Sequence, residues 1–120
     1  MPDEYMDVFL SEEDFMLRDT LRDFVNKEIV PVRQQIDDDK DHVIVNGIIK
    51  KLIGMGLQRA AFPEEYGGLG AGSAVTLAMI HEELGRGDSG ICTAFTVTGW
   101  CWQAALAAQN KAVMDRFAAE

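Results

Sequence analysis

The chain has 120 residues, of which 48% are hydrophobic and 26% are charged, and its formal net charge at pH 7 is −9. This length accommodates one modest hydrophobic core and is too short for two, and the composition is that of a globular protein rather than a disordered one. The negative charge argues against nucleic acid and against anionic membrane surfaces as partners, because both repel an acidic protein.

The first nine residues and the two cysteines bear on domain organisation and compartment. Residues 1–9 are expected to form a flexible N-terminal arm, since the opening residues show no periodic pattern, and residues 10–120 are expected to form one helical domain. Cys92 and Cys101 lack the CxxC spacing of redox and zinc motifs. Without a recognisable signal peptide, they are expected to be reduced, buried and inert thiols of a cytoplasmic protein.

A first helix is predicted to begin at Ser11. The Ser11 hydroxyl can cap the free backbone amides, with Asp14 three residues on, while Glu12 and Glu13 suit the positive end of the helix dipole. Apolar residues then recur at helical spacing up to Pro31, which ends or bends the helix: Leu17, Leu21, Phe24 and Val25. Residues 33–41 form a polar, acidic connection with room for a short helix.

A second amphipathic helix is predicted before Gly54 and Gly56, from the apolar residues Val45, Ile48, Ile49, Leu52 and Ile53. The segment 62–70 that follows is expected to be an ordered loop between helical layers. Pro63 excludes Phe62 from helical geometry, and the closely spaced glycines favour backbone angles that other residues resist. The rings of Phe62 and Tyr66 are expected to pin this loop to the core.

Two further long helices are predicted after the loop, and the second carries no charge. The first of them begins at Ser73 and stops at Gly85 and Gly87, after which Ser89 can cap the next. Residues 89–110 contain no charged side chain, and apolar residues fall on every side. Such a helix is buried all round or lies in lipid. Threonines and amides dilute its hydrophobicity and no basic cluster flanks it, so a buried central helix is favoured over a membrane span. A last amphipathic helix begins near Lys111.

One face of the uncharged helix gathers Phe95, Thr96, Gly99 and Trp102, within about 100° of one another. A glycine at this place costs roughly 1 kcal/mol relative to alanine, which suggests that something approaches closely. The composition favours another helix packed against Gly99; the alternative is a ligand.

No catalytic residue and no metal ligand set is predicted. A calcium loop counted from Asp37 has His42 where glycine is needed and Ile48 where glutamate is needed, so residues 37–42 are expected to be a solvated surface segment. His81 has no second histidine at helical spacing for zinc. The cysteines have no neighbouring base, so neither is predicted to be a nucleophile. The glycines of the loop follow no strand, so no dinucleotide-binding loop is predicted.

Several stretches carry a resemblance to the acyl-CoA dehydrogenases. The sequence PEEYGGLG at 63–70 looks like a loop of that family. The flanking stretches LSEE at 10–13, LRDTLRDFV at 17–25, LIGMGL at 52–57 and EELGRGDS at 82–89 are similar to it in order and spacing. The resemblance covers about residues 8–118 and is limited to the N-terminal helical domain.

The resemblance implies an all-α, orthogonal or up-down bundle of about five to six helices around a buried central helix. It also implies an FAD enzyme that desaturates an acyl-CoA thioester, with the flavin site and the catalytic glutamate in central β and C-terminal helical domains that these residues do not include. Alone, the chain is expected to be inactive and to bind no cofactor. Phe95, Thr96, Gly99 and Trp102 would then border the acyl chain, forming a short, aromatic cavity. An electron-transferring flavoprotein is the implied partner of the complete enzyme.

The chain departs from the family pattern at residues 108–114, so a shifted register would turn Trp100 rather than Trp102 inward. Acyl-CoA oxidases and flavin monooxygenases have similar helical domains and remain alternatives. So do a non-catalytic helical interaction subunit and an unrelated helical binding module. Because the surface that normally meets the β domain would be exposed, self-association is expected near the uncharged helix or the glycine-rich loop.

Overall fold

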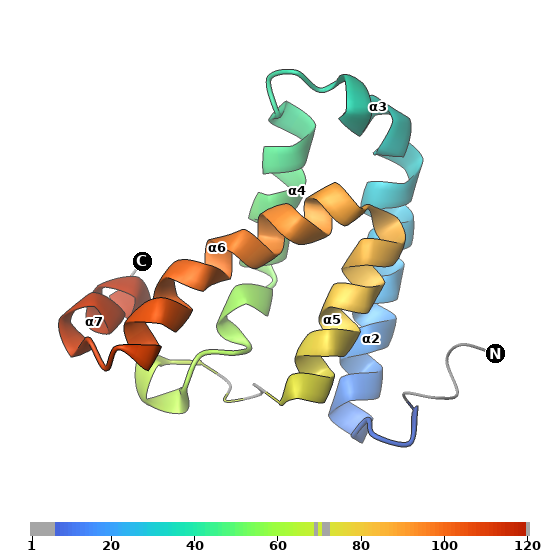
Figure 1. Cartoon of the computed structure of the whole chain (residues 1–120). Helices are drawn as coiled ribbons and strands as arrows, with labels where there is room; N and C mark the ends of the chain where they lie inside the picture. Colours follow the sequence, from blue (N-terminus) through green and yellow to red (C-terminus); the bar gives the residue numbers. More distant parts are fainter. Residues whose placement is uncertain (1–6, 69, 71–72, 120) are drawn as a thin grey trace.

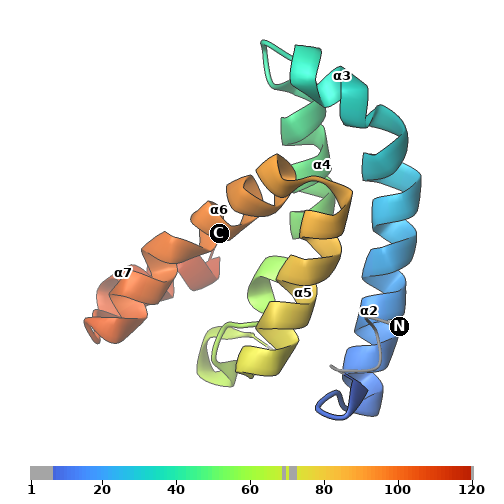
Figure 2. The same cartoon turned by 45° about the vertical axis from the view of Figure 1, so that its right-hand side comes forward.

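A computed structural model describes residues 7–68, 70 and 73–119. Among these residues the regular secondary structure is helical, with turns and loops between the helices and no strand (Figure 1). The prediction of an all-α bundle is confirmed. The described part of the chain has principal extents of 41 × 40 × 19 Å, so the molecule is flat. Helices α2 and α5 run side by side, and α6 leaves the end of α5 and crosses to α7 (Figure 1, Figure 2).

Helix α2 (Glu12–Phe24) begins where the sequence predicts. The Ser11 hydroxyl accepts the Asp14 backbone N–H at 3.1 Å, and the Asp14 carboxylate accepts the Ser11 N–H at 2.9 Å. This reciprocal pair satisfies backbone donors that no carbonyl of the helix can reach. The other oxygen of Asp14 accepts the Thr76 hydroxyl at 2.7 Å, which ties the start of α2 to the start of α5.

Pro31 bends the chain rather than ending the helix. The backbone passes from α2 through a π-helical turn, η1 (Val25–Ile29), and a 3₁₀ turn, η2 (Val30–Val32), into the short helix α3 (Arg33–Asp38). Proline has no N–H to donate, and the irregular turns accommodate that loss. Arg33 lies just past the bend and donates to the carbonyl oxygens of Arg86 and Gly87, at 3.0 and 2.7 Å.

Helix α4 (Val43–Gly54) follows a tight acidic turn. Gly56 ends this segment in a left-handed conformation with φ of 77°, as the sequence predicts. The chain then forms two 3₁₀ turns, η3 (Leu57–Arg59) and η4 (Glu64–Tyr66). The N–H groups of Gly68 and Gly70 donate to the carbonyls of Pro63 and Phe62 at 3.2 and 3.0 Å, so the loop folds back on itself. Leu69 lies outside the described residues.

Gly68 is required in this loop because its backbone lies directly against that of Phe62. A Cβ at this position would overlap the Phe62 carbonyl. Phe62 is buried, which confirms that it pins the loop to the core, and Tyr66 packs partly buried against the same cluster.

The remaining helices are α5 (Ala74–Gly87), α6 (Ser89–Ala107) and α7 (Lys111–Ala119). Ser73 caps α5, as predicted. Asp88, not Ser89, caps α6, because its carboxylate accepts the Ile91 N–H at 2.8 Å. A carboxylate at this position also faces the positive end of the helix dipole.

The core forms two clusters. The larger lies between α2, η1, α4, α5 and the first half of α6, and the smaller joins Phe62 and Trp102 to Ala105 and Met114 of the second half and of α7. An ion-pair network fixes α2 to α5: the buried Glu83 carboxylate accepts Arg22 at 2.5 Å and Arg86 at 3.2 Å.

Burial of α6 on every side is a prediction that the structure corrects. Helix α6 is central in that it contacts α4, α5 and α7, but only one face of it is covered. Ile91, Phe95, Trp102 and Ala105 are buried, whereas Val97 and Trp100 are 45% and 57% exposed. The helices described here are too few to surround α6, so its uncharged outer face meets solvent.

Candidate functional site

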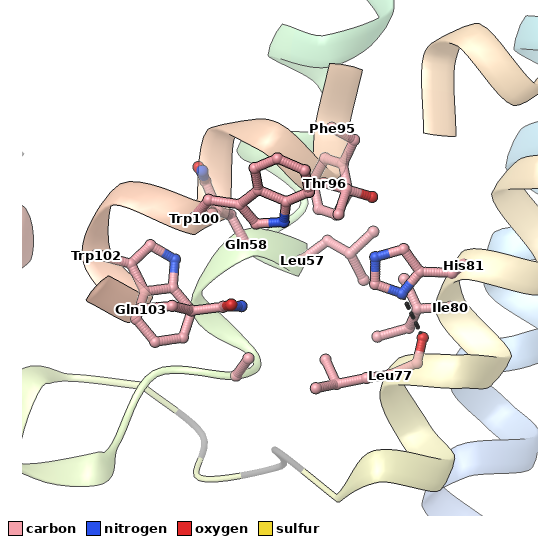
Figure 3. Close-up of a pocket in the computed structure, with 12 residues that line it drawn as sticks. Leu57, Gln58, Leu77, Ile80, His81, Phe95, Thr96, Trp100, Trp102 and Gln103 are labelled. Carbon is pink, nitrogen blue, oxygen red and sulfur yellow. Dashed lines mark hydrogen bonds between the residues drawn. The ribbon is translucent and has the colours of Figure 1, made fainter. Parts of the chain in front are cut away.

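A cavity of about 210 Å³ lies between one face of α6, the first part of α5 and the segment 57–61 (Figure 3). It is open on one side. Its lining is mostly apolar and contains no Asp, Glu, Lys or Arg: Leu57, Gln58, Ala61, Leu77, Ile80, His81, Phe95, Thr96, Gly99, Trp100, Trp102 and Gln103.

All four residues that the sequence singles out line this cavity. Phe95 and Trp102 are 7% and 5% exposed, and Thr96 and Gly99 lie between them on the same side of α6. Trp102 is the inward ring, and the exposed Trp100 forms the rim (Figure 3). Helix α6 continues in register to Ala107, and the change of direction falls at Gln109, whose φ is 54°. The departure from the family pattern at residues 108–114 therefore does not shift the register of α6, and Trp102 keeps its inward position.

Gly99 faces open space rather than a neighbouring helix. An added Cβ would have two neighbours within 4 Å, the indole Nε1 of Trp102 at 3.4 Å and the amide Nε2 of Gln103 at 3.9 Å, both on α6 itself. Close helix packing against Gly99, the alternative that composition favours, does not occur among the described residues. The glycine instead widens the cavity.

Trp102 is held by the glycine-rich loop. Its indole meets the Phe62 ring edge-on, with ring centroids 4.3 Å apart and planes at 61°. Edge-to-face aromatic pairs add about 0.5–1.5 kcal/mol beyond the area they bury. The loop fixes Phe62, and Phe62 fixes the position of the Trp102 ring at the end of the cavity.

His81 and Gln103 also line the cavity, and the sequence reasoning missed both. The His81 Nδ1 lies 2.6 Å from the Leu77 carbonyl, which can only accept, so Nδ1 carries a proton and Nε2 is left for the cavity side. His81 is partly exposed. His81 lies four residues after Leu77, so helical spacing could have placed both on the face of α5 toward α6.

The thiols and acidic side chains of the described residues form no activated nucleophile and no metal cluster at the cavity. Burial raises the pKa of the Cys92 thiol, and its sulfur donates to the His81 carbonyl at 3.4 Å, so it is a poor nucleophile. The prediction that both cysteines are buried is wrong, since Cys92 is only partly buried and Cys101 is a free, exposed thiol on the outer face. Within the described ranges no three His, Cys, Asp or Glu side chains converge as a metal site would require. In the acidic turn, Asp39 bonds backbone amides of α4 instead.

Two other points concern larger ligands and membranes. Pockets that enclose a drug-sized ligand have volumes of about 300–1,000 Å³, and the cavity of about 210 Å³ is smaller. Among the described residues, no helix combines the length and the hydropathy needed to cross a bilayer.

Comparisons with known proteins agree with the helical fold. A family profile described as "Acyl-CoA dehydrogenase, N-terminal domain" matches residues 11–119. The human protein named short-chain specific acyl-CoA dehydrogenase, mitochondrial, is 40% identical over 83 residues, 69% of this chain and 19% of its own length. The probable acyl-CoA dehydrogenase YngJ of Bacillus subtilis is 35% identical, covering 78% of this chain and 24% of its own length.

A third relative is the glutaryl-CoA dehydrogenase of Desulfococcus multivorans, 39% identical over 72% of this chain and 22% of its own length. The chain thus spans about a fifth of the length of the curated relatives it matches. No solved structure matches the chain.

Proposed function

The chain belongs to the acyl-CoA dehydrogenase family, within its N-terminal domain, and from that membership we propose that its α6 cavity forms part of the wall around the acyl chain of a thioester substrate. The observation that carries the proposal is the convergence of Phe95, Thr96, Gly99 and Trp102 on one cavity. The cavity is apolar, small and open at one side, which suits a short hydrocarbon tail entering from outside.

The reaction itself belongs to the complete enzyme. We propose α,β-desaturation of an acyl-CoA, with FAD as the cofactor and an electron-transferring flavoprotein as the acceptor. The lining of the α6 cavity contains no Asp, Glu, Lys or Arg, so no chemical step is assigned to it. Its part is to bind and orient the acyl group and to exclude water from that group. The 120 residues alone are expected to be inactive.

The proposal is tested by filling the space at Gly99. Gly99→Leu places a side chain in the cavity, so the chain should lose affinity for longer acyl thioesters more than for shorter ones. The measurement is titration with butanoyl and octanoyl thioesters of N-acetylcysteamine, followed by nuclear magnetic resonance. In the enzyme that contains this domain, the same variant should shift the ratio of kcat/KM toward short substrates.

Gly85→Leu is the matched control. Gly85 is likewise a helical glycine, but no atom lies within 4 Å of its Cβ position, and it lies on the exposed side of α5, away from the cavity. An unchanged chain-length preference in Gly99→Leu would show that this helix does not form the acyl wall.

The exposed face of α6 supports a second function, as an interaction domain. Val97 and Trp100 of α6 and Ile53 and Met55 near the end of α4 are large apolar side chains that are all more than 40% exposed. We propose that this surface meets the remaining domains in the complete enzyme and causes the isolated chain to self-associate. Sedimentation at a series of dilutions tests this, and a monomer at every concentration would contradict it.

The electron acceptor and the compartment are the remaining proposals. Acyl-CoA oxidases and flavin monooxygenases are the alternative enzyme classes, and oxygen consumption by the complete enzyme would identify either. We propose a cytoplasmic location, since both cysteines are unpaired. The human relative is named as mitochondrial, so imaging of a tagged protein should compare the two compartments.

A further inference from the structure

A buried hydrogen-bond donor at the cavity has no partner. The indole Nε1 of Trp102 is inaccessible to solvent and bonds to nothing among the described residues, although the residue is 95% buried. A buried N–H without a partner costs about 1–3 kcal/mol, and most buried donors in proteins are satisfied. The other such atom in the described part of the chain, Arg18 Nε, belongs to a guanidinium that pairs with Asp7 through another nitrogen.

The space that Gly99 leaves empty is bordered by this donor. The position of the missing Cβ lies 3.4 Å from Trp102 Nε1 and 3.9 Å from the side-chain nitrogen of Gln103, with no other atom outside the local backbone of α6 within 4 Å. Both neighbours are N–H donors. A ligand oxygen on the cavity side of this position would be within reach of both N–H groups, whereas a methyl group there would leave the indole unsatisfied. Figure 3 shows the two side chains at the same end of the cavity.

The oxygen that suits this place carries no charge. Among the residues that line the cavity there is no Lys or Arg to compensate a carboxylate. Burying an unpaired charge is far more costly than burying a hydrogen-bonded neutral oxygen. Gln58 does not compete for the ligand, because its amide nitrogen already donates to Thr98 at 2.8 Å.

From this geometry we propose that the cavity selects acyl groups that carry an uncharged oxygen, a hydroxyl or a carbonyl, at the end remote from the thioester. Trp102 Nε1 is the donor that recognises it, and Gly99 keeps the place open. The inference rests on the proposed role of α6 as an acyl wall and specifies the class of acyl group that the wall accepts. Trp102 and Gly99 are thus specificity-determining residues.

The experiment compares three thioesters of N-acetylcysteamine with this chain. The 4-hydroxybutanoyl and pentanoyl groups have the same length and differ in a terminal hydroxyl or methyl, and the 4-carboxybutanoyl group adds a charge. The hydroxyl-ended probe should bind roughly three- to tenfold more tightly than the methyl-ended one, the range that one hydrogen bond supplies. The carboxylate-ended probe should bind more weakly than either.

The indole signals report the contact directly. The chain has two tryptophans, so Trp100→Phe assigns the N–H signal of Trp102 in a ¹⁵N correlation spectrum. That signal should move downfield with the hydroxyl-ended probe and much less with the methyl-ended one.

Two variants remove the recognition in different ways. Trp102→Phe removes the N–H and keeps an aromatic ring against Phe62. Gly99→Ala leaves the indole in place and adds a methyl group 3.4 Å from its nitrogen, which crowds the approach of a ligand oxygen. Both should reduce the affinity ratio of hydroxyl-ended to methyl-ended probe to about one. Circular dichroism checks that each retains its helices, and Gly99→Ala, a favourable change within a helix, covers the case in which Trp102→Phe unfolds.

The outcomes separate this inference from the proposed function. Binding of pentanoyl and hydroxybutanoyl thioesters with equal affinity would overturn the oxygen recognition and leave the acyl wall standing. A preference that survives Trp102→Phe and Gly99→Ala would assign the oxygen to another group and overturn the inference. Failure of all three probes to bind would overturn the acyl wall and the inference with it.

Discussion

Asp39 shows how one side chain can organise a helix start that the sequence does not reveal. Its carboxylate accepts the backbone N–H groups of Val43, Ile44 and Val45 at 2.7–3.2 Å, while His42 adopts a left-handed backbone with φ of 55°. In sequence, Asp39 is one aspartate in an acidic run, and only the turn at His42 brings it over the end of α4. The segment is a solvated surface turn, as predicted, with a structural role that was missed.

Asp39→Ala should destabilise the chain by about 1–2 kcal/mol, because an N-terminal cap contributes that much and a charged one lies at the upper end. Urea denaturation followed by helicity measures it. Asp38→Ala, at the exposed neighbouring position, should change stability by no more than about 0.5 kcal/mol. Equal effects of the two substitutions would show that net charge, not capping, is responsible.

Asp14 gives the chain a pH-dependent contact. The Ser11 backbone N–H and then the Thr76 hydroxyl hold the pKa of this carboxyl below its ordinary value, against an opposing effect of burial. A carboxyl with a lowered pKa contributes stability that is present above its unfolded-state pKa and is lost as the pH falls through its folded-state pKa.

Asp14→Asn should therefore be less stable than the parent chain at neutral pH, and the difference should shrink as the pH falls below the ordinary carboxyl range. Denaturation curves for both proteins from pH 7 to pH 2.5 measure the difference. A difference that stays constant across that range would mean that the charge of Asp14 does not matter to folding.

At the scale of elements, α5 and the π-helical turn η1 meet at a glycine. A Cβ at Gly87 would lie 2.7 Å from Val25 Cγ1 and 3.2 Å from Ile29 Cγ2, and both of these side chains are fully buried. The sequence predicts Gly85 and Gly87 together as helix stops. The structure separates them, since only Gly87 is needed for close approach and Gly85 faces open space.

Gly87→Ala should accordingly destabilise the chain by about 1–3 kcal/mol through overpacking. Gly85→Ala should stabilise it by up to about 1 kcal/mol, the difference in helix propensity between the two residues. Thermal and urea unfolding of both variants provide the comparison. Opposite signs are the expected result, and a stabilising Gly87→Ala would contradict the packing of α5 on η1.

Helix α6 marks the limit of what periodicity can predict. The uncharged segment is a helix, as predicted, but its lack of charge wrongly predicts burial on every side. The spacing of Phe95, Thr96, Gly99 and Trp102 correctly predicts a shared face, because that depends on local geometry alone. The other face is equally uncharged but exposed. The sequence shows that a helix face lacks charged residues. It does not show whether the surface that would bury that face belongs to the same chain. His81 and Gln103 were missed because their place at the cavity depends on how α5 crosses α6.

At the scale of the molecule, the fold was predictable because several independent patterns agree: caps at Ser11 and Ser73, a break near Pro31, and glycine stops. The flat shape was not, since it follows from crossing angles between helices. The chain matches one family domain and about a fifth of its relatives' length. A flat domain with an exposed apolar face is what we expect if other domains cover that face, as proposed above.

The measurement that most directly tests the central claim is photo-crosslinking of this chain with a pentanoyl thioester that carries a diazirine near the end of its acyl group, followed by mass spectrometry of the peptides. An acyl wall on the inner face of α6 predicts label on Phe95, Gly99, Trp102 and the facing residue Leu57. An excess of the methyl-ended thioester should suppress that label. Label confined to the outer-face residues Val97 and Cys101, or unaffected by competition, would contradict the claim.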